Sequence, residues 1–219
     1  MAKVTIAIDG PAGAGKSTIA KRIAELKNLL YIDTGAMYRA ITLKLLNNNV
    51  AIHDKDRIKT ILENTNIEFI EGSIFLDDIR VDDEIREPRI NENVSEVSAI
   101  PLIRETLVGL QRKIAENNNV VMDGRDIGTR VLPDAKYKFF LTASIGERAE
   151  RRYEELVKKG YGCNYEEVVK EITKRDKIDS ERVLDPLQKA EDAILVDTTG
   201  KNIAEVIDII MDEMKSIDS

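Results

Sequence analysis

The segment AIDGPAGAGKSTIAKRIAEL, which begins at Ala7, restricts the possible folds of this chain more than any other feature. Its residues Gly10 to Ser17 fit the pattern G-x-x-x-x-G-K-[ST] between an apolar run and a helical one. Glycines let successive backbone N–H groups curl around phosphate oxygens, and the following helix points its N-terminus at the same anion. The lysine of such a loop reaches the β- and γ-phosphates, and its serine hydroxyl can ligate Mg²⁺. The segment therefore predicts a phosphate-binding loop.

Five short apolar runs have the length of buried parallel strands. They are VTIAI at 4–8, LLYI at 29–32, VVM at 120–122, YKFFL at 137–141 and AILV at 193–196. Each is followed by a turn or polar residue and then by a helix-like stretch, which is typical of βαβ units. Ser144, Asn164 and Asn202 each precede a glutamate by three residues and mark helix starts. We therefore expect an α/β fold, with a five-stranded parallel sheet flanked by helices.

Residues 66–86 break this rhythm. The stretch NIEFIEGSIFLDDIRVDDEIR alternates apolar and polar residues, with Gly72 and Asp77-Asp78 at turn positions. This pattern predicts a small antiparallel sheet of two or three strands. We interpret residues from about 62 to 95 as an insertion outside the parallel sheet.

Composition limits the possible partners and locations. The net charge of −7 argues against broad nucleic-acid binding, which needs a positive surface. No apolar stretch approaches the ~18 residues of a membrane span, and MAKVTIAIDG lacks a signal peptide's apolar region. A single cysteine, Cys163, and a single histidine, His53, exclude an internal disulfide and a Cys/His metal site. We expect a cytoplasmic protein that binds neither nucleic acid nor membranes.

A phosphate-binding loop serves switches as well as enzymes, and two short matches favour a GTP switch. Residues 173–176 (TKRD) match a guanine-binding pattern, and residues 197–200 (DTTG) match a switch pattern. In GTPases, however, the switch pattern comes first and the guanine-binding pattern follows a strand. Here the order is reversed, and TKRD lies inside the helical run YEEVVKEITKRDKI. Both observations disfavour a switch.

Arginines indicate a second anion site, as expected for an enzyme with two phosphorylated substrates. Arg125 directly follows a buried run, at the edge where open α/β sheets bind their ligands. Further candidates are Arg39, Arg148, Arg151, Arg152, Arg175 and Arg182. For the three arginines of GERAERRYEE, a solvated helix face with exposed ion pairs is the alternative interpretation.

Together these segments resemble the bacterial cytidylate kinases, members of the nucleoside-monophosphate kinase family. The resemblance covers nearly the whole chain, because several motifs appear in the family's order. They are IAIDGPAGAGKST, YIDTGAMYRA, VVMDGRDIGT with VLPDA, ERAERR and KRDKIDSERVLDPL. The resemblance implies a kinase core at residues 1–34, 100–145 and 190–219. It also implies a monophosphate-binding region at about 35–99 that includes the insertion, and a lid at about 146–188.

The resemblance also implies a role for each site residue. Lys16, Asp123, Arg125 and Arg182 would be catalytic, with Ser17 on Mg²⁺ and Asp123 holding the metal through water. The ATP phosphates would contact Gly10, Pro11, Ala12, Gly13, Ala14, Gly15, Lys16, Ser17, Thr18, Arg151 and Arg152. The monophosphate would contact Thr34, Tyr38, Arg39, Ser95, Arg104, Arg125, Asp126, Arg175, Asp179 and Arg182. Within this set, Ser95, Arg104 and Asp126 would bind cytosine, and Arg175 and Asp179 the ribose.

The cytosine assignment is chemically consistent. Cytosine presents an N4 amino donor beside the acceptors N3 and O2, so a carboxylate and an arginine complement it. Uracil presents O4 and N3–H instead, and an ionised Asp126 would then face an acceptor, at a cost of ~1–3 kcal/mol. The chain is thus expected to convert ATP and CMP or dCMP into ADP and CDP or dCDP, as a monomer. A kinase for another monophosphate such as UMP or AMP, and a nucleotide-binding switch, remain alternatives.

Overall fold

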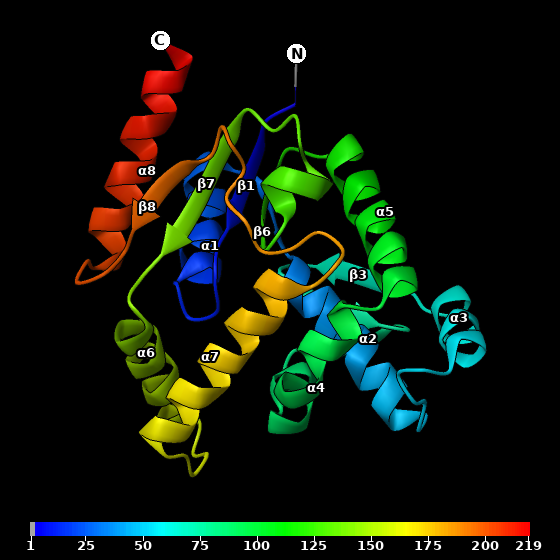
Figure 1. The fold of residues 1–219 in the computed structure, drawn as a ribbon. Helices are drawn as coiled ribbons and strands as arrows, with labels where there is room; N and C mark the ends of the chain where they lie inside the picture. Colours follow the sequence, from blue (N-terminus) through cyan, green and yellow to red (C-terminus); the bar gives the residue numbers. More distant parts are fainter. Residues whose placement is uncertain (1–2) are drawn as a thin grey trace. The chain divides into compact units, whose positions relative to one another are not determined.

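The structure is a computed structural model that describes residues 3–219 and divides into two compact units (Figure 1). The first unit contains the residues up to Tyr31 together with Asn118–Ser219, and the second contains Ile32–Asn117.

A five-stranded sheet of order β2-β6-β1-β7-β8 is the framework of the first unit. β1 lies at its centre and pairs in parallel with β6 and β7, and β7 pairs in parallel with β8. The strands are β1 (Thr5–Asp9), β2 (Leu30–Asp33), β6 (Val120–Gly124), β7 (Tyr137–Thr142) and β8 (Ile194–Asp197), with β2 ending in the second unit. The sheet confirms the predicted fold class, and all five predicted runs are strands.

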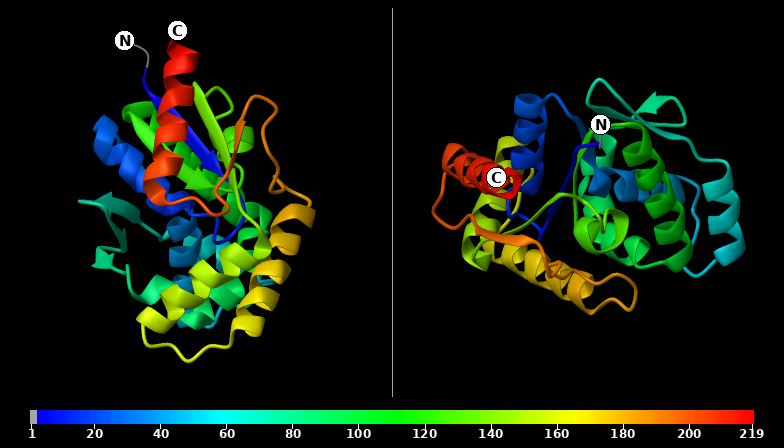
Figure 2. Two further views of the ribbon diagram at one scale, coloured as in Figure 1. Left: turned by 90° about the vertical axis from the view of Figure 1, so that its left-hand side faces the viewer. Right: turned by 90° about the horizontal axis from the view of Figure 1, so that it is seen from above.

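Helices α1 (Lys16–Lys27) and α8 (Ile203–Asp218) cover one face of this sheet (Figure 2). Their apolar sides and the inward side chains of the strands form one core, which includes Ile6, Ile8, Ile19, Ile23, Phe139, Leu141, Val196, Val206 and Ile210. Burial of this surface stabilises the sheet and fixes the loop that joins β1 to α1. Asn202 and Glu205 form the predicted capping box at the start of α8.

Helices α6 (Ile145–Lys158) and α7 (Tyr165–Glu181) follow β7 and pack side by side (Figure 1). Ala149, Val168 and Ile172 form the apolar contact between them. The Ser144 and Asn164 side chains cap the two helices, as predicted. Residues 173–176 lie inside α7 and do not follow a strand in the chain, which confirms the helical setting predicted for TKRD.

The second unit is mainly helical and carries the predicted small antiparallel sheet. Strands β3 (Ile67–Ile70), β4 (Ser73–Leu76) and β5 (Ile79–Arg80) form that sheet, with Glu68 opposite Phe75. The helices are α2 (Thr34–Asn47), α3 (Lys55–Glu63), α4 (Pro88–Ser98) and α5 (Pro101–Asn117), with a 3₁₀ turn at Glu84–Arg86. Buried Met37, Ile41, Ile58, Ile90 and Ile103 supply apolar core.

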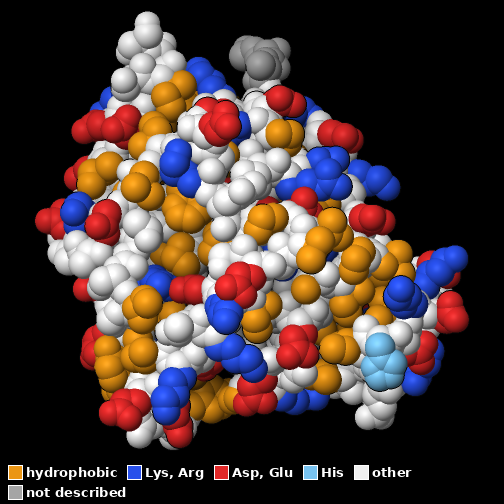
Figure 3. All heavy atoms as spheres, viewed as in Figure 1, with side chains coloured by type: hydrophobic (Ala, Val, Ile, Leu, Met, Phe, Trp, Pro, Cys, Tyr) orange, Lys and Arg blue, Asp and Glu red, His pale blue; other side chains and the backbone are white. Residues whose placement is uncertain are grey.

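Basic and acidic side chains are interspersed on the face that Figure 3 shows. Within residues 3–219, no helix has both the length and the apolar character needed to cross a membrane.

Candidate active site

The loop between β1 and α1 is shaped by glycines that no other residue can replace without strain. Gly10, Gly13 and Gly15 have φ angles of 145°, 76° and 85°. A Cβ atom on Gly10 would lie 2.0 Å from the carbonyl oxygen of Leu141 in β7. Gly15 is the N-cap of α1, and no side chain caps the N–H groups of this helix. The loop therefore presents backbone donors of the kind that bind phosphate.

Replacing Gly10 by alanine should destabilise the fold. The new methyl group would overlap a backbone oxygen of β7, and φ would remain in a region that L-residues avoid. We expect Gly10→Ala to lower the free energy of unfolding by about 3 kcal/mol or more in urea denaturation. Gly200→Ala is the matched control, because Gly200 has a φ of 68° but nothing within 4 Å of the new Cβ. A Gly10→Ala loss no larger than the control's loss of ~1–2 kcal/mol would contradict the steric account.

Lys16, Ser17 and Asp123 meet where the loop enters α1. Lys16 is almost fully buried, and its Nζ donates to the carbonyl oxygen of Pro11 at 2.7 Å. Asp123, at the end of β6, accepts a hydrogen bond from the Ser17 hydroxyl at 2.9 Å and another from the Tyr31 hydroxyl at 2.8 Å. The predicted catalytic and metal-binding side chains are thus assembled within the first unit. Sequence analysis missed Tyr31, which orients the Asp123 carboxylate.

The Ser17–Asp123 pair suits a Mg²⁺ ion that is also bound by a nucleotide, and it does not suit a metal ion bound by protein ligands alone. The described residues contain no group of three or more His, Cys, Asp or Glu side chains placed to hold a metal ion. One hydroxyl and one carboxylate, at Ser17 and Asp123, are the donors that fit. Mg²⁺ keeps several waters and is usually held by one or two carboxylates together with substrate phosphates. The pair is therefore compatible with a metal that arrives with a nucleotide.

The electrostatics of the loop favour a bound anion. Burial lowers the pKa of Lys16 well below its usual range, and the charge of Arg125 lowers it further, while Asp123 raises it in part. A phosphate beside the ammonium group would offset this cost, because an opposite charge favours the charged form.

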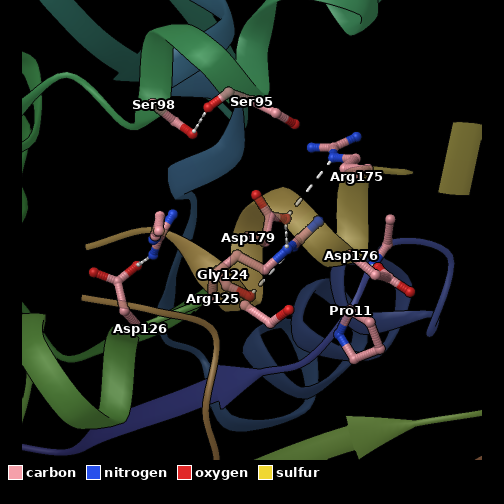
Figure 4. Close-up of polar contacts among 12 residues, drawn as sticks. Pro11, Ser95, Ser98, Gly124, Arg125, Asp126, Arg175, Asp176 and Asp179 are labelled. Carbon is pink, nitrogen blue, oxygen red and sulfur yellow. Dashed lines mark hydrogen bonds and ion pairs between the residues drawn. The ribbon is translucent and has the colours of Figure 1, made fainter. Parts of the chain in front are cut away.

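Arg125, directly after β6, and Arg175 and Asp179 on α7 form a charged cluster next to the loop (Figure 4). Arg125 Nε lies 2.8 Å from Asp179 Oδ2, and Arg175 Nε lies 4.0 Å from the same oxygen. Burial disfavours the Asp179 carboxylate, but the charges of Arg125 and Arg175 outweigh burial and lower its pKa. Burial, followed by the charge of Arg125, lowers the pKa of Arg175 to about 10. Two guanidinium groups thus share one carboxylate.

The excess positive charge of this cluster indicates an anion site. Arg175 Nε is buried and has no hydrogen-bond partner among the residues that the structure describes. An unpaired buried donor is costly, and a ligand oxygen would satisfy it.

Asp126 and Arg182 form a second buried pair in the first unit. Arg182 Nη2 donates to Asp126 Oδ1 at 3.1 Å, and Arg182 Nε donates to the carbonyl oxygen of Asp185 at 2.7 Å. Asp126 directly precedes a π-helical turn at Ile127–Val131. The structure therefore brings Asp126 together with Arg182, although the two residues are 56 positions apart in the chain.

Asp9 supports this π-helical turn and was missed by sequence analysis. Its carboxylate, at the end of β1, accepts hydrogen bonds from the backbone N–H groups of Ile127 at 2.8 Å and Gly128 at 2.7 Å. Burial raises the pKa of Asp9 to about 6, although both hydrogen bonds oppose the rise. A polar residue directly after a buried strand was the available signal.

The raised pKa of Asp9 predicts a pH-dependent stability. The folded state binds the proton of the Asp9 carboxyl more tightly than the unfolded state. Asp9 therefore contributes most to the free energy of unfolding below pH ~4, and this contribution is lost as the pH rises through about 6. The rise from 3.8 to about 6 corresponds to about 3 kcal/mol. We expect wild type to lose roughly this much stability relative to Asp9→Asn between pH 4 and pH 7, in urea denaturation. A difference that does not change with pH would contradict the raised pKa.

The second unit contains the remaining predicted substrate residues. Arg104, at 1% exposure, lies 5.7 Å from the centroid of the Tyr38 ring, and its Nη1 donates to the carbonyl oxygen of Ser98 at 3.1 Å. The Ser98 hydroxyl donates to the carbonyl oxygen of Ser95 at 2.9 Å. Thr34, Tyr38 and Arg39 lie on α2, Ser95 on α4 and Arg104 on α5. The structure thus brings Tyr38 and Arg104 into contact.

The three arginines of α6 differ in their surroundings. For Arg148 the solvated-face interpretation is wrong, because the side chain is buried and hydrogen-bonds to the phosphate-binding loop. Arg151 donates to Thr198 and pairs with Glu147 at 3.0 Å. Its Nη1 also lies 3.7 Å from the point where a Cβ on Gly15 would be. Arg152, half-buried, pairs with Glu155 at 2.9 Å.

Comparison with known proteins identifies the family of this chain. The family model for cytidylate kinases matches residues 6–216. The chain belongs to the cytidylate kinase family. A cytidylate kinase of Caldanaerobacter subterraneus subsp. tengcongensis is 57% identical over 97% of this chain and 95% of its own length. A cytidylate kinase of Alkaliphilus oremlandii is 55% identical over 98% of this chain and 99% of its own length. Family membership supports a nucleotide kinase over a switch protein.

Solved structures share the fold. An uncharacterised protein from Eubacterium ventriosum superposes with a TM-score of 0.55 at 17% identity, covering 98% of this chain and 99% of its own. At this identity the likeness concerns the fold alone.

Proposed function

We propose that this member of the cytidylate kinase family transfers the γ-phosphoryl group of ATP directly to CMP, giving ADP and CDP. The observation that carries the proposal is that two groups of positive charge lie in one unit. The first is the glycine loop with Lys16. The second consists of Arg125 directly after β6, Arg175 on α7 and Arg182 directly after α7. A nucleotide switch needs only the first of these. The family resemblance assigns the second to the acceptor phosphate and ribose.

Each predicted site residue keeps its role in this proposal. Lys16 and the backbone of the loop bind the β- and γ-phosphates. Ser17 and Asp123 would hold Mg²⁺, which when bound would supply positive charge to the phosphates. Arg151 is the better of the two lid candidates for a phosphate, because it lies over Gly15. Arg39, Arg125 and Arg182 bind the acceptor phosphate, and Arg175 and Asp179 the ribose. Arginine suits this role because its planar fork matches phosphate oxygens.

No covalent intermediate is required. Phosphoryl transfer asks the protein to position the two nucleotides and to place positive charge around the transferring group. Water must be excluded, or ATP would be hydrolysed instead. We assign this role to the lid at about 146–188 and to the monophosphate-binding region at about 35–99, the remainder being the kinase core. Use of dCMP, a cytoplasmic location and a monomeric state stay predictions.

The base specificity provides a separate test. We expect Asp126→Ala to lower the ratio of kcat/KM for CMP to kcat/KM for UMP, because the carboxylate that accepts from the cytosine amino group is lost. Asp126→Asn should lower it further, since an amide can donate to O4 of uracil. The assay measures ADP production with ATP and each monophosphate.

Loss of the Asp126 carboxylate also leaves Arg182 without this partner, so overall activity should fall. Arg130→Met, which removes a half-exposed guanidinium from the neighbouring π-helical turn, is the control that should keep the wild-type ratio. An unchanged CMP/UMP ratio in both Asp126 variants would remove Asp126 from base recognition.

A further inference from the structure

The backbone carbonyl and N–H groups of Ala12, in the phosphate-binding loop, are both bound by side chains of the lid helices α6 and α7. Arg148 Nη1, from α6, donates to the carbonyl oxygen of Ala12 at 3.0 Å. The N–H of Ala12 donates to Asp176 Oδ1, from α7, at 3.3 Å. Arg148 and Asp176 are themselves paired at 2.5 Å. The two side chains thus clamp Ala12 in the middle of the phosphate-binding loop.

The Arg148 side of the clamp is buried. The Arg148 guanidinium has 6% of its side chain exposed and also donates, through Nε, to the carbonyl oxygen of Ala143 at 3.0 Å. A buried guanidinium that loses its carboxylate partner is strongly unfavourable. Because Arg148 is held at Ala12, Ala143 and Asp176, α6 and α7 are attached to the loop through one charged group.

The neighbouring glycine shows how closely α6 approaches the loop. A Cβ on Gly13 would lie 2.9 Å from the carbonyl oxygen of Arg148 and 3.0 Å from its Cβ. The backbone of the first turn of α6 is therefore in van der Waals contact with the loop beside Ala12. This contact is independent of the charged pair and points to the same junction.

Helix α7 extends the junction to the second anion site. Asp176 follows Arg175 directly and lies less than one helical turn before Asp179, the residue paired with Arg125. Figure 4 shows Asp176 beside Pro11 of the loop, with Arg175, Asp179 and Arg125 next along the same helix and strand end. A displacement of the loop at Ala12 would therefore displace the groups that hold the second anion.

We infer that Arg148 and Asp176 are positioning residues that couple the two nucleotide sites. ATP phosphates that order the loop fix Ala12, and the clamp passes this order to Arg175 and Asp179 on α7. Binding of the donor then favours binding of CMP, and by linkage the reverse also holds. The inference rests on the proposed function, because it takes CMP as the ligand of the second site.

Isothermal titration of the full chain tests the coupling. The Kd of CMP is measured alone and with saturating Mg²⁺ and AMP-PNP, a nonhydrolysable ATP analogue, and the ratio of the two is the coupling factor. We expect a factor of about 5 or more in wild type. Arg148→Met removes the clamp, and Asp176→Asn removes its charge while keeping an acceptor for the Ala12 N–H. Both should bring the factor close to 1. Lys159→Met, which breaks an exposed pair with Glu155 at the far end of α6, should keep the wild-type factor.

The outcomes separate the inference from the proposed function. A wild-type coupling factor in both clamp variants, or a factor of 1 in wild type, overturns the coupling and leaves CMP as the substrate. A wild-type chain that binds AMP-PNP but not CMP overturns both. Should Arg148→Met fail to fold, as judged by its thermal melting, Asp176→Asn decides the question, because it preserves the shape of the site.

Discussion

Replacing Lys16 by alanine should lower kcat by about 10³-fold or more, which corresponds to ~4 kcal/mol of lost transition-state stabilisation. Lys16 is almost fully buried at the entrance of α1, next to Ser17 and Asp123, where a transferring phosphoryl group would develop negative charge. Burial makes each charge interaction stronger than it would be in water. Lys21, the next lysine in the chain, lies exposed on α1 and cannot replace it.

The fold of the Lys16→Ala variant should remain intact. The ammonium group makes one hydrogen bond to Pro11, and burial already disfavours its charged form, so its removal costs the folded state little. Steady-state kinetics and thermal melting measured together separate the two effects. Lys21→Ala is the control on the same helix and should keep wild-type turnover. Near-normal turnover of Lys16→Ala would refute its role.

Replacing Arg125 by methionine should have the second-largest effect, on CMP rather than ATP. We expect kcat/KM for CMP to fall by about 10³-fold or more, while KM for ATP changes less than tenfold. The guanidinium follows directly after β6, contacts Asp179 and adds to the positive charge around Arg175. Its loss removes hydrogen-bond donors for the phosphate of CMP, and it leaves the negative charge of the Asp179 carboxylate partly uncompensated.

The Arg125 variant should also be less stable, because breaking a buried ion pair typically costs ~3–5 kcal/mol. The double variant Arg125→Met/Asp179→Asn is therefore needed. It should recover much of the lost stability but none of the activity, because the neutral pair still offers no charge to a phosphate. Recovery of activity together with stability would show that Arg125 acts only through folding.

Local patterns predicted the strands and the loop that carry the candidate site. The phosphate-binding loop from Gly10 to Ser17 follows from an apolar run, glycine positions and a lysine-serine pair that lie close together in the sequence. Arg125 was predicted as a site residue for the same reason, since it directly follows a buried strand. Such signals need no knowledge of distant contacts.

The contacts that organise the site were not predictable in this way. Asp9 meets Ile127 and Gly128 across 118 and 119 positions, and Arg148 meets Ala12 across 136. These pairs depend on which strands neighbour each other and on how α6 packs against the loop. The spacing within GERAERRYEE equally suits a solvated face, and only the packing of α6 against the loop shows that Arg148 is buried.

The central claim is that the chain binds two nucleotides together and transfers phosphate directly from one to the other. The most direct measurement is a reaction with ATP labelled in its γ-phosphate and equimolar CMP, UMP and AMP, with the labelled products separated. The account predicts that the label appears in CDP and that one CDP forms for each unlabelled ADP. Little label should appear in UDP, in the labelled ADP that AMP would give, or in inorganic phosphate. Label that appears mainly in inorganic phosphate, or in another diphosphate before CDP, would contradict it.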